Sequence, residues 1–398
     1  MWQPAVQDKT IRKGIETKLK DLNEVISKTE APGSGFYGGE AGLLLFLNYF
    51  NKYSESSLND PFIETKIEKI FNSLDSLGSG ALSTGYTGIN WVIEHLISNG
   101  FIDLEDELFH ATEDVIKAAF INMINDRNYD FMHGSFGSLF YFSEMSHKLN
   151  FHDELKLFRE RIYKDFHIDD SNFGIETHLN IDGTRGYSLG LSHGVPAYIM
   201  VLIRLLESNS LDADVVKDLV AKNYKFMMQF EYKNPEKSFF PHSIVNNAGS
   251  PSRLSWCYGD LGCALAIYKY GQLINDKTMM NKAIEIILFN SKKRDPAKLG
   301  ISDADFCHGT VGIAHFFSRF YNYTQVEEFR QAAEYWYGET LNYAKYSDGL
   351  CGYKHLHQMP DQFVSLPGML EGVSGIGLCL ISAIENIEPK WDKAFLLS

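Results

Sequence analysis

Residues 39–47 read Gly-Glu-Ala-Gly-Leu-Leu-Leu-Phe-Leu, so two glycines three positions apart are followed directly by five apolar residues. This unit, a G-x-x-G step and an apolar run, occurs seven times along the chain, and in the fourth copy Ala197 replaces the second glycine. The first glycines of the seven copies are Gly39, Gly85, Gly134, Gly194, Gly259, Gly309 and Gly372. A unit repeated every few tens of residues indicates a fold built from copies of one structural element.

Amphipathic helices are predicted between these copies. Apolar residues recur with a 3.6-residue period from Ile11 to Ile26 and again from Ile63 to Leu74, which is the pattern of a helix with one buried face. The runs after the glycine steps are apolar on all sides, which is typical of a fully buried helix. Each unit therefore predicts an outer amphipathic helix, a loop and an inner buried helix.

Seven such pairs predict an all-α fold, an α/α toroid with a double ring of seven inner and seven outer helices. An open solenoid of helix pairs is the alternative. The glycine steps favour the closed ring, because small residues at the start of a helix let neighbouring backbones approach closely near an axis.

The composition is that of a globular protein with a large core. Of the 398 residues, 44% are hydrophobic and 14% aromatic, which excludes a disordered chain. Lys and Arg number 37 against 51 Asp and Glu, a net charge of −14, so binding of nucleic acid through a general basic surface is not expected. A length prior favours two or three domains, but the repeats predict a single domain over residues 1–398. Residues 165–185 have the composition of an inserted segment, and residues 233–252 that of a long loop.

No targeting or membrane-spanning segment is expected. Residues 1–22 are interrupted by charge every few positions, and the longest apolar run, Val195 to Ile203, is too short to span a bilayer. The five cysteines are odd in number and widely spread, so a disulfide framework is not expected either. These features predict a cytoplasmic protein, with any membrane association made through partner proteins.

If the helices alternate between the two rings, the residues before all seven glycine steps converge on one rim of the toroid. Cys257, Cys307 and His308 are the strongest set among them, because two thiolates and one imidazole suit a zinc ion with an open fourth position. The repeat places both cysteines at nearly equivalent positions before adjacent inner helices. The structural alternative is two buried cysteines and a loop histidine. Core or otherwise ordinary positions are expected for the other cysteines, Cys263, Cys351 and Cys379.

His193, Asp130 and Arg253 are candidates for acid–base and electrostatic roles at the same rim. His193 would act as acid or base, Asp130 would favour its charged form, and Arg253 would stabilise a developing oxyanion. The structural alternatives are a core histidine, a helix N-cap and a surface ion pair. The histidines that compete with His193 for its role are His133, His315 and the pair His355-x-His357, which is also an alternative metal-binding pattern.

Four short motifs accompany the later glycine steps. They are Ser192-His193-Gly194, Trp256-Cys257-Tyr258-Gly259, Cys307-His308-Gly309 and residues 370–378, which read LEGVSGIGL. With the seven glycine steps in order, they resemble the lanthionine synthetase C-like (LanC) family over almost the whole chain. The resemblance implies an α/α toroid with a zinc ion at one end. The length is similar to that of a stand-alone lanthipeptide cyclase, and not of a synthetase fused to its own dehydratase domain.

The resemblance also implies roles for single residues and a reaction. It places the zinc ligands at Cys257, Cys307 and His308, the acid/base histidine at His193, its acidic neighbour at Asp130 and the active-site arginine at Arg253. The implied reaction adds peptide cysteine thiolates to dehydroalanine or dehydrobutyrine and so forms lanthionine or methyllanthionine thioether rings. The implied partners are a dehydrated lanthipeptide precursor peptide, a dehydratase and an export transporter. His133 departs from the family pattern and leaves open which histidine pairs with Asp130.

Three other classes of protein are alternatives. A glycan-active α/α-toroid enzyme would need paired carboxylates, for which the rim offers Asp130, Asp305 and Glu371, but the two cysteines would then be unexplained. A LanC-like protein that binds zinc and a thiol peptide, or glutathione, without cyclising it is the second. A structural helical-repeat adaptor is the third, and it would bind no metal.

Overall fold

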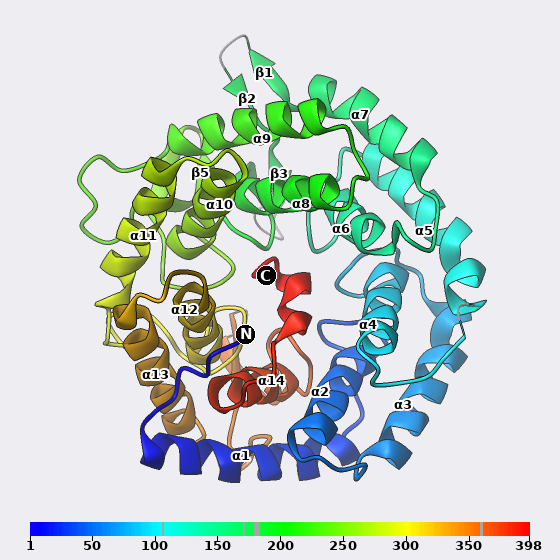
Figure 1. The fold of residues 1–398 in the computed structure, drawn as a ribbon, viewed down its shortest axis with the longest axis vertical. Coiled ribbons are helices and arrows are strands. Elements are labelled where there is room, and N and C mark those ends of the chain that lie inside the picture. Colours follow the sequence, from blue (N-terminus) through cyan, green and yellow to red (C-terminus); the bar gives the residue numbers. More distant parts are fainter. Residues whose placement is uncertain (106, 170–171, 179–183, 359–360) are drawn as a thin grey trace.

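The computed structural model describes residues 1–105, 107–169, 172–178, 184–358 and 361–398, and in this part of the chain fourteen α-helices form two concentric rings (Figure 1). The inner helices are α2 (Glu40–Tyr53), α4 (Tyr86–Ser98), α6 (Ser135–Met145), α8 (Val195–Glu207), α10 (Asp260–Leu273), α12 (Thr310–Thr324) and α14 (Val373–Ile384). The outer helices are α1 (Lys9–Lys28), α3 (Asp60–Ser73), α5 (Glu107–Asn125), α7 (His152–Phe166), α9 (Ala213–Met228), α11 (Lys277–Ser291) and α13 (Glu327–Asn342).

The repeat determines where the helices lie. Each inner helix begins at the residue that follows the first glycine of a G-x-x-G step, and nearly every residue of an inner helix such as α8 is buried. The outer helix α1 is instead buried along one face only, which includes Ile15, Leu19 and Ile26. An Asp8 side chain caps its first turn by accepting hydrogen bonds from the backbone N–H groups of residues 10 and 11. Both helix types are therefore as the sequence predicts.

The ring is closed. The last inner helix, α14, packs against the first inner helix, α2, and the first outer helix, α1, packs against both α13 and α14. The α/α toroid is thus confirmed, and the open solenoid is wrong.

The glycines of the steps are required by their own loops more than by neighbouring helices. A Cβ atom at Gly88 would lie 1.9 Å from the carbonyl oxygen of Leu82, and one at Gly312 would lie 1.9 Å from that of Phe306. Each loop folds back over the first turn of the helix that it starts, so the second glycine of the step leaves room for a carbonyl six residues earlier. Neighbouring loops also approach closely at these positions, as expected: a Cβ atom at Gly137 would lie 2.8 Å from Leu82 Cβ, and one at Gly262 would lie 3.0 Å from Leu191 Cγ.

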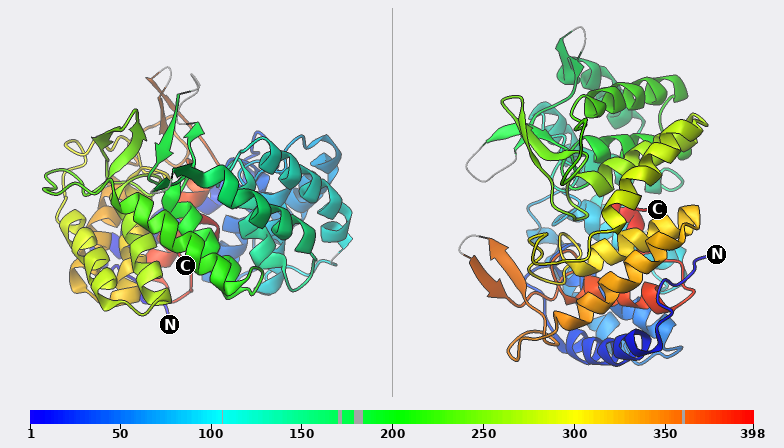
Figure 2. Two further views of the ribbon diagram at one scale, coloured as in Figure 1. Left: turned by 90° about the horizontal axis from the view of Figure 1, so that it is seen from above. Right: turned by 90° about the vertical axis from the view of Figure 1, so that its left-hand side faces the viewer.

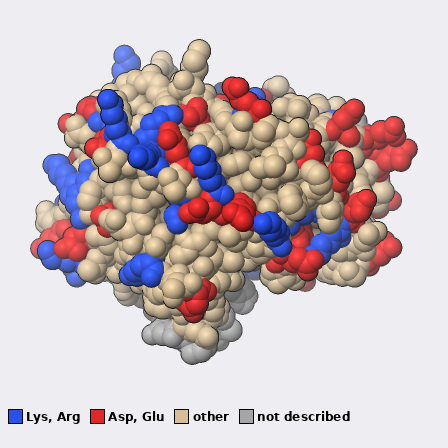
Figure 3. Space-filling model, turned by 90° about the horizontal axis from the view of Figure 1, so that it is seen from below, with Lys and Arg blue, Asp and Glu red and all other residues tan. Residues whose placement is uncertain are grey.

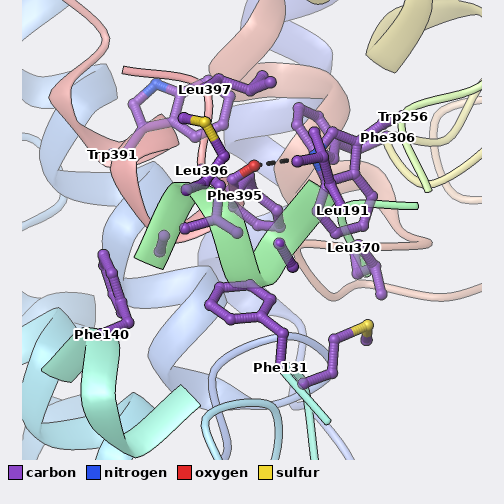
Figure 4. Packing of buried hydrophobic residues seen from close by; sticks show 14 of the residues in the cluster. Phe131, Phe140, Leu191, Trp256, Phe306, Leu370, Trp391, Phe395, Leu396 and Leu397 are labelled. Atoms are coloured by element: carbon purple, nitrogen blue, oxygen red, sulfur yellow. Dashed lines mark hydrogen bonds between the residues drawn. The ribbon is translucent and has the colours of Figure 1, made fainter. Parts of the chain in front are cut away.

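The C-terminal segment fills the axis of the ring. The residue three positions before each first glycine is fully buried, and these residues are Phe36, Leu82, Phe131, Leu191, Trp256, Phe306 and Met369. The 3-10 helix η2 (Lys390–Phe395) places the ring of Phe395 4.5 Å from that of Phe306 and 5.5 Å from that of Trp256. The Trp256 indole Nε1 donates a 2.9 Å hydrogen bond to the Phe395 carbonyl (Figure 4). The seven loops are thereby anchored to one apolar centre.

Short strands project from one end of the ring (Figure 2). A four-stranded antiparallel sheet has the order β3 (Thr177–His178), β4 (Arg185–Ser188), β5 (Pro241–Val245) and β6 (Ala248–Pro251), and two strand pairs are formed by β1 (His167–Asp169) with β2 (Asn172–Phe173) and by β7 (His355–Gln358) with β8 (Asp361–Val364). Strands β1 to β4 lie in or next to residues 165–185, the predicted insertion, of which 170–171 and 179–183 fall outside the described residues.

Residues 233–252 contain a hairpin, where the composition predicts a long loop. Val245 of β5 pairs with Ala248 of β6, and the two residues between them, Asn246 and Asn247, have φ values of 50° and 62°. Asparagine tolerates this left-handed backbone better than most residues, so Asn-Asn is a suitable two-residue turn between antiparallel strands. The turn residues indicate a hairpin that composition alone does not reveal.

The surface agrees with the mixed charge of the sequence. On the face that carries α1, Lys and Arg side chains are interspersed with Asp and Glu side chains (Figure 3). Among the helices that the structure describes, none has the length and apolar character needed to cross a lipid bilayer.

Candidate functional site

The seven loops that start the inner helices meet at one end of the ring and are hydrogen-bonded to one another. The backbone N–H of Cys257 donates to the carbonyl of Cys307 at 3.3 Å, and the N–H of Cys307 donates to the carbonyl of Leu370 at 3.1 Å. The Ser192 hydroxyl donates to the Cys257 carbonyl at 3.1 Å. The third residue before each glycine is fixed in the core, and the residue directly before the glycine is at least partly exposed at the rim in every loop.

Cys257, Cys307 and His308 come together at this rim. Each offers a donor atom, and the three donor atoms all lie within 4.8 Å of one another. Cys257 is buried, whereas Cys307 and His308 are partly exposed, so the cluster can be reached from outside. Two sulfurs and one imidazole nitrogen suit a zinc ion that keeps one coordination position for a further ligand. The donor set therefore fits a catalytic type of zinc site, and its occupation by zinc stays a prediction.

The electrostatics of the three groups support a strongly polar cluster. Burial alone would raise the pKa of the Cys257 thiol, but hydrogen bonds from Cys307 and His308 hold that pKa well below its ordinary value. The hydrogen bond to Cys257, together with burial, raises the pKa of Cys307. Burial opposes the charged form of His308, yet the charges of Asp305 and Cys257 raise its pKa to about 10. These shifts favour a negative charge on the Cys257 sulfur, where a cation would bind.

Asp130 and His193 form a second pair at the rim, in the loops before α6 and α8. Asp130 Oδ2 lies 2.6 Å from His193 Nδ1, and 25% of the His193 side chain is exposed. Burial lowers the pKa of His193, but the charge and hydrogen bond of Asp130 outweigh burial and raise that pKa above its ordinary value. Asp130 therefore favours the charged form of His193, which is also accessible, and this suits a proton donor.

The question of which histidine pairs with Asp130 has a geometric answer. His133 uses its backbone N–H, which donates to Asp130 Oδ1 at 2.7 Å, and its ring Nδ1 lies 2.8 Å from the Ser83 hydroxyl. The rings of His133 and His193 stack with centroids 5.9 Å apart. The pKa of His133 lies below its ordinary value, because desolvation and the charge of His193 outweigh the attraction of Asp130. The side-chain partner of Asp130 is His193.

Arg253 is close enough to the sulfur cluster for its charge to lower the pKa of Cys257. Its charge also lowers the pKa of His242, for which burial is the larger cause. Within the described residues Arg253 has no ion-pair partner, so the surface ion pair that was the structural alternative is not found there. A partly buried guanidinium beside the site is available to an anion.

Tyr258 belongs to the site although sequence reasoning gave it no role. Its ring centroid lies 6.5 Å from that of His193 and 6.0 Å from that of His242. Burial, followed by the charge of Cys257, raises the pKa of Tyr258, so its hydroxyl stays protonated. The sequence signal that could have identified Tyr258 is its position: it directly precedes Gly259, as His193 precedes Gly194 and His308 precedes Gly309.

A cavity opens beside the Asp130–His193 pair. Its volume is 590 Å³, and its walls are formed by the loop at residues 78–80, by α5, by residues 128–133 and by β3 and β4. Asp130, His133 and His193 line it. A segment of extended peptide could reach His193 through this cavity.

The comparisons with known proteins agree with this architecture. A model of the family described as lanthionine synthetase C-like protein matches residues 30–396. The chain belongs to that family. Among solved structures, nisin cyclase is similar over 98% of each chain, with a TM-score of 0.73 and 19% sequence identity, a likeness that concerns the fold. No curated protein is matched by the sequence.

Other candidate residues of this LanC-like chain are engaged elsewhere. His315 lies in α12, fully buried, with Nε2 2.9 Å from Asp392, so its ring is held in the core and not presented at the rim. His357 lies on β7 and is exposed. Cys263 and Cys379 are buried in inner helices, as expected.

Asp305, one of the carboxylates offered by the glycan-active alternative, is not free. Asp305 is 2% exposed, its Oδ1 accepts the backbone N–H groups of His308 and Gly309, and its Oδ2 is bonded to His355. A general acid or nucleophile of a glycosidase must reach its substrate. This family member therefore does not present Asp305 as one of a catalytic carboxylate pair.

Proposed function

We propose that this LanC-like protein is a zinc-dependent lanthipeptide cyclase. Its substrate would be a dehydrated precursor peptide, and its product would carry lanthionine or methyllanthionine rings. The observation that carries the proposal is the convergence of two independent sets on one rim: the Cys257, Cys307 and His308 donors, and the Asp130–His193 pair.

Cys257, Cys307 and His308 would hold the zinc ion, and the open position would receive the substrate cysteine. Bound zinc would lower the pKa of that thiol and so supply a thiolate at neutral pH. Tyr258 connects the two halves of the site, because it follows Cys257 in the chain and its ring faces that of His193.

The reaction is an addition without oxidation or reduction. The substrate thiol loses its proton, a C–S bond forms between its sulfur and the β-carbon of the dehydroamino acid, and the Cα=Cβ double bond is used up. Negative charge then develops on the carbonyl oxygen next to the α-carbon, where Arg253 would stabilise it. His193, whose charged form Asp130 favours, would donate a proton to the α-carbon. The proton lost by the thiol, passed through solvent, would then protonate His193 again. Product and substrate are isomers.

The substrate must already contain dehydroalanine or dehydrobutyrine. A dehydratase acting on serine or threonine would therefore work before this protein, and an export transporter would act on the product. Both are proposals that rest on the cyclase assignment.

The test is incubation of the zinc-loaded protein with a synthetic peptide that contains one cysteine and one dehydroalanine. Cyclisation does not change the mass, so free thiols are alkylated with iodoacetamide before mass spectrometry, and ring formation appears as loss of the alkylated form. The expected result is a rate far above that of the peptide alone. A protein that binds zinc and the peptide but leaves the thiol free would instead be a thiol-binding member of the family without cyclase activity.

A further inference from the structure

The third and sixth loops of the ring repeat one motif, Asp-Phe-x-His-Gly, at residues 130–134 and 305–309. In both copies the aspartate Oδ1 accepts the backbone N–H of the histidine three residues later, at 2.7 Å from His133 and at 2.8 Å from His308. In both copies the aspartate Oδ2 also holds the Nδ1 atom of a histidine from another part of the chain. The two aspartates therefore have the same pattern of contacts.

The second histidine differs in accessibility. His193, on Asp130, has 25% of its side chain exposed, whereas His355, 2.7 Å from Asp305, has only 4% exposed. His355 lies on β7, fifty residues from Asp305 in the chain. A side chain so deeply buried does not reach a peptide substrate, so the Asp305–His355 pair requires a different role from that of the Asp130–His193 pair.

The ring of His308 also lies differently from that of His133. His133 turns to Ser83, but His308 has its Nε2 atom 3.5 Å from Asp305 Oδ2 and 3.9 Å from Asp303 Oδ2. The Asp305 carboxylate thus faces the His308 ring, caps its backbone N–H at 2.8 Å and caps the next N–H, of Gly309, at 2.9 Å. One carboxylate thus contacts both the backbone and the imidazole ring of His308, a proposed zinc ligand.

We infer that Asp305, held in place by His355, is a positioning residue that orients His308 for the metal. Its Oδ2 atom, 3.5 Å from His308 Nε2, would favour a proton on that nitrogen and so leave Nδ1 available as the metal donor. Metal-binding histidines generally donate their other ring nitrogen to a carboxylate or carbonyl, and such partners set ring orientation and metal affinity. The inference rests on the zinc site of the proposed function and assigns the carboxylate that completes it.

The decisive variant is Asp305→Asn. Asparagine keeps an oxygen for the two backbone N–H groups but presents an NH₂ group to the His308 ring, which favours the tautomer with its proton on Nδ1. Zinc affinity, measured against a chromogenic chelator with zinc alone as the probe, is expected to fall by about 10- to 100-fold. His355→Gln, which removes the support of Asp305 without altering the loop, is expected to weaken zinc binding in the same direction by a smaller factor.

Asp130→Asn is the matched control, because it makes the same exchange in the sister motif and is expected to leave zinc affinity at the wild-type value. The cobalt-substituted protein gives a second readout, since the visible bands of Co²⁺ report ligand geometry and are expected to shift in Asp305→Asn and not in Asp130→Asn.

Equal zinc affinity in wild type and Asp305→Asn would overturn the inference. A second equivalent of zinc in the wild type that is lost in Asp305→Asn and His355→Gln would also overturn it. The group of Asp303, Asp305, His308 and His355 would then be a metal site of its own. Failure of cyclisation with the expected affinity pattern intact would count against the proposed function and leave the positioning role of Asp305 standing.

Discussion

The third and sixth loops of this toroid share one motif and one backbone cap, and the proposal gives them different chemistry. Residues 130–134 and 305–309 share the motif Asp-Phe-x-His-Gly and the same aspartate cap on the backbone N–H of the histidine. They differ at the variable position, which is Met132 in one loop and Cys307 in the other, and in the neighbouring loop, which supplies His193 to one and Cys257 to the other. A repeated scaffold can thus present acid–base chemistry at one position and metal chemistry at another by single substitutions on fixed loops.

The largest effect on thioether formation is expected from a substitution at the variable position of the motif. Cys307→Ala is expected to reduce thioether formation to the rate of the peptide alone, because the remaining two donors are too few for a stable catalytic zinc site. The matched control is Met132→Ala, the same change in the sister loop, which is expected to retain cyclisation. The alkylation assay checks both variants. Comparable losses in the two would contradict the assignment of metal chemistry to the sixth loop and not to the third.

The accessible histidine that the fourth loop supplies to Asp130 comes next. His193→Ala is expected to slow ring formation by a factor on the order of 10²–10⁴, which is the usual contribution of a general acid, while the zinc content stays unchanged. Single-turnover kinetics on zinc-loaded protein measure the loss. A wild-type rate in this variant would remove His193 from the mechanism.

The charge of Asp130 should appear in the pH dependence. Asp130 raises the pKa of His193, and His193 must be protonated to act as the acid, so activity is lost as pH rises through that pKa. Asp130→Asn is expected to lower the pKa of His193 and so to move the high-pH limb of the rate profile to lower pH. A limb that stays in place would show that another group sets it.

The smallest effect is expected at His133. Its ring bonds only to the Ser83 hydroxyl among the described side chains, so His133→Ala should cost about 0.5 to 1.5 kcal/mol of stability, the net value of one hydrogen bond. The cyclisation rate should change little. Chemical denaturation and the kinetic assay test this. A loss of cyclisation rate as large as that in His193→Ala would show that the acid–base role belongs to His133.

The inner helices and most of the site residues could be predicted from the sequence, because the same local pattern occurs seven times. Seven glycine steps locate seven inner helices, and the register before Gly259 and Gly309 brings Cys257 close to Cys307. The Asp130–His193 pair lies on adjacent loops of the same ring and so follows from the same reasoning.

Contacts outside the repeat could not be predicted in this way. His355 reaches Asp305 from a strand pair between the sixth and seventh steps, and nothing periodic relates the two residues. Phe395 comes from a C-terminal 3-10 helix with no counterpart in the repeat, yet it packs against loop residues such as Trp256 and Phe306. Tertiary packing determines such contacts, and local patterns do not record them.

The central claim is that the two motifs have separate roles on one rim: Asp130 supports acid–base chemistry at His193, and Cys307 and His308 bind zinc together with Cys257. Its most direct test is the metal content of the purified wild type, Cys257→Ala, Cys307→Ala and His193→Ala, determined side by side by mass spectrometry of the elements. The account predicts about one zinc per chain in the wild type and in His193→Ala, and almost none in the two cysteine variants. A wild type without zinc, prepared in the absence of chelators, or zinc retained in both cysteine variants, would contradict it.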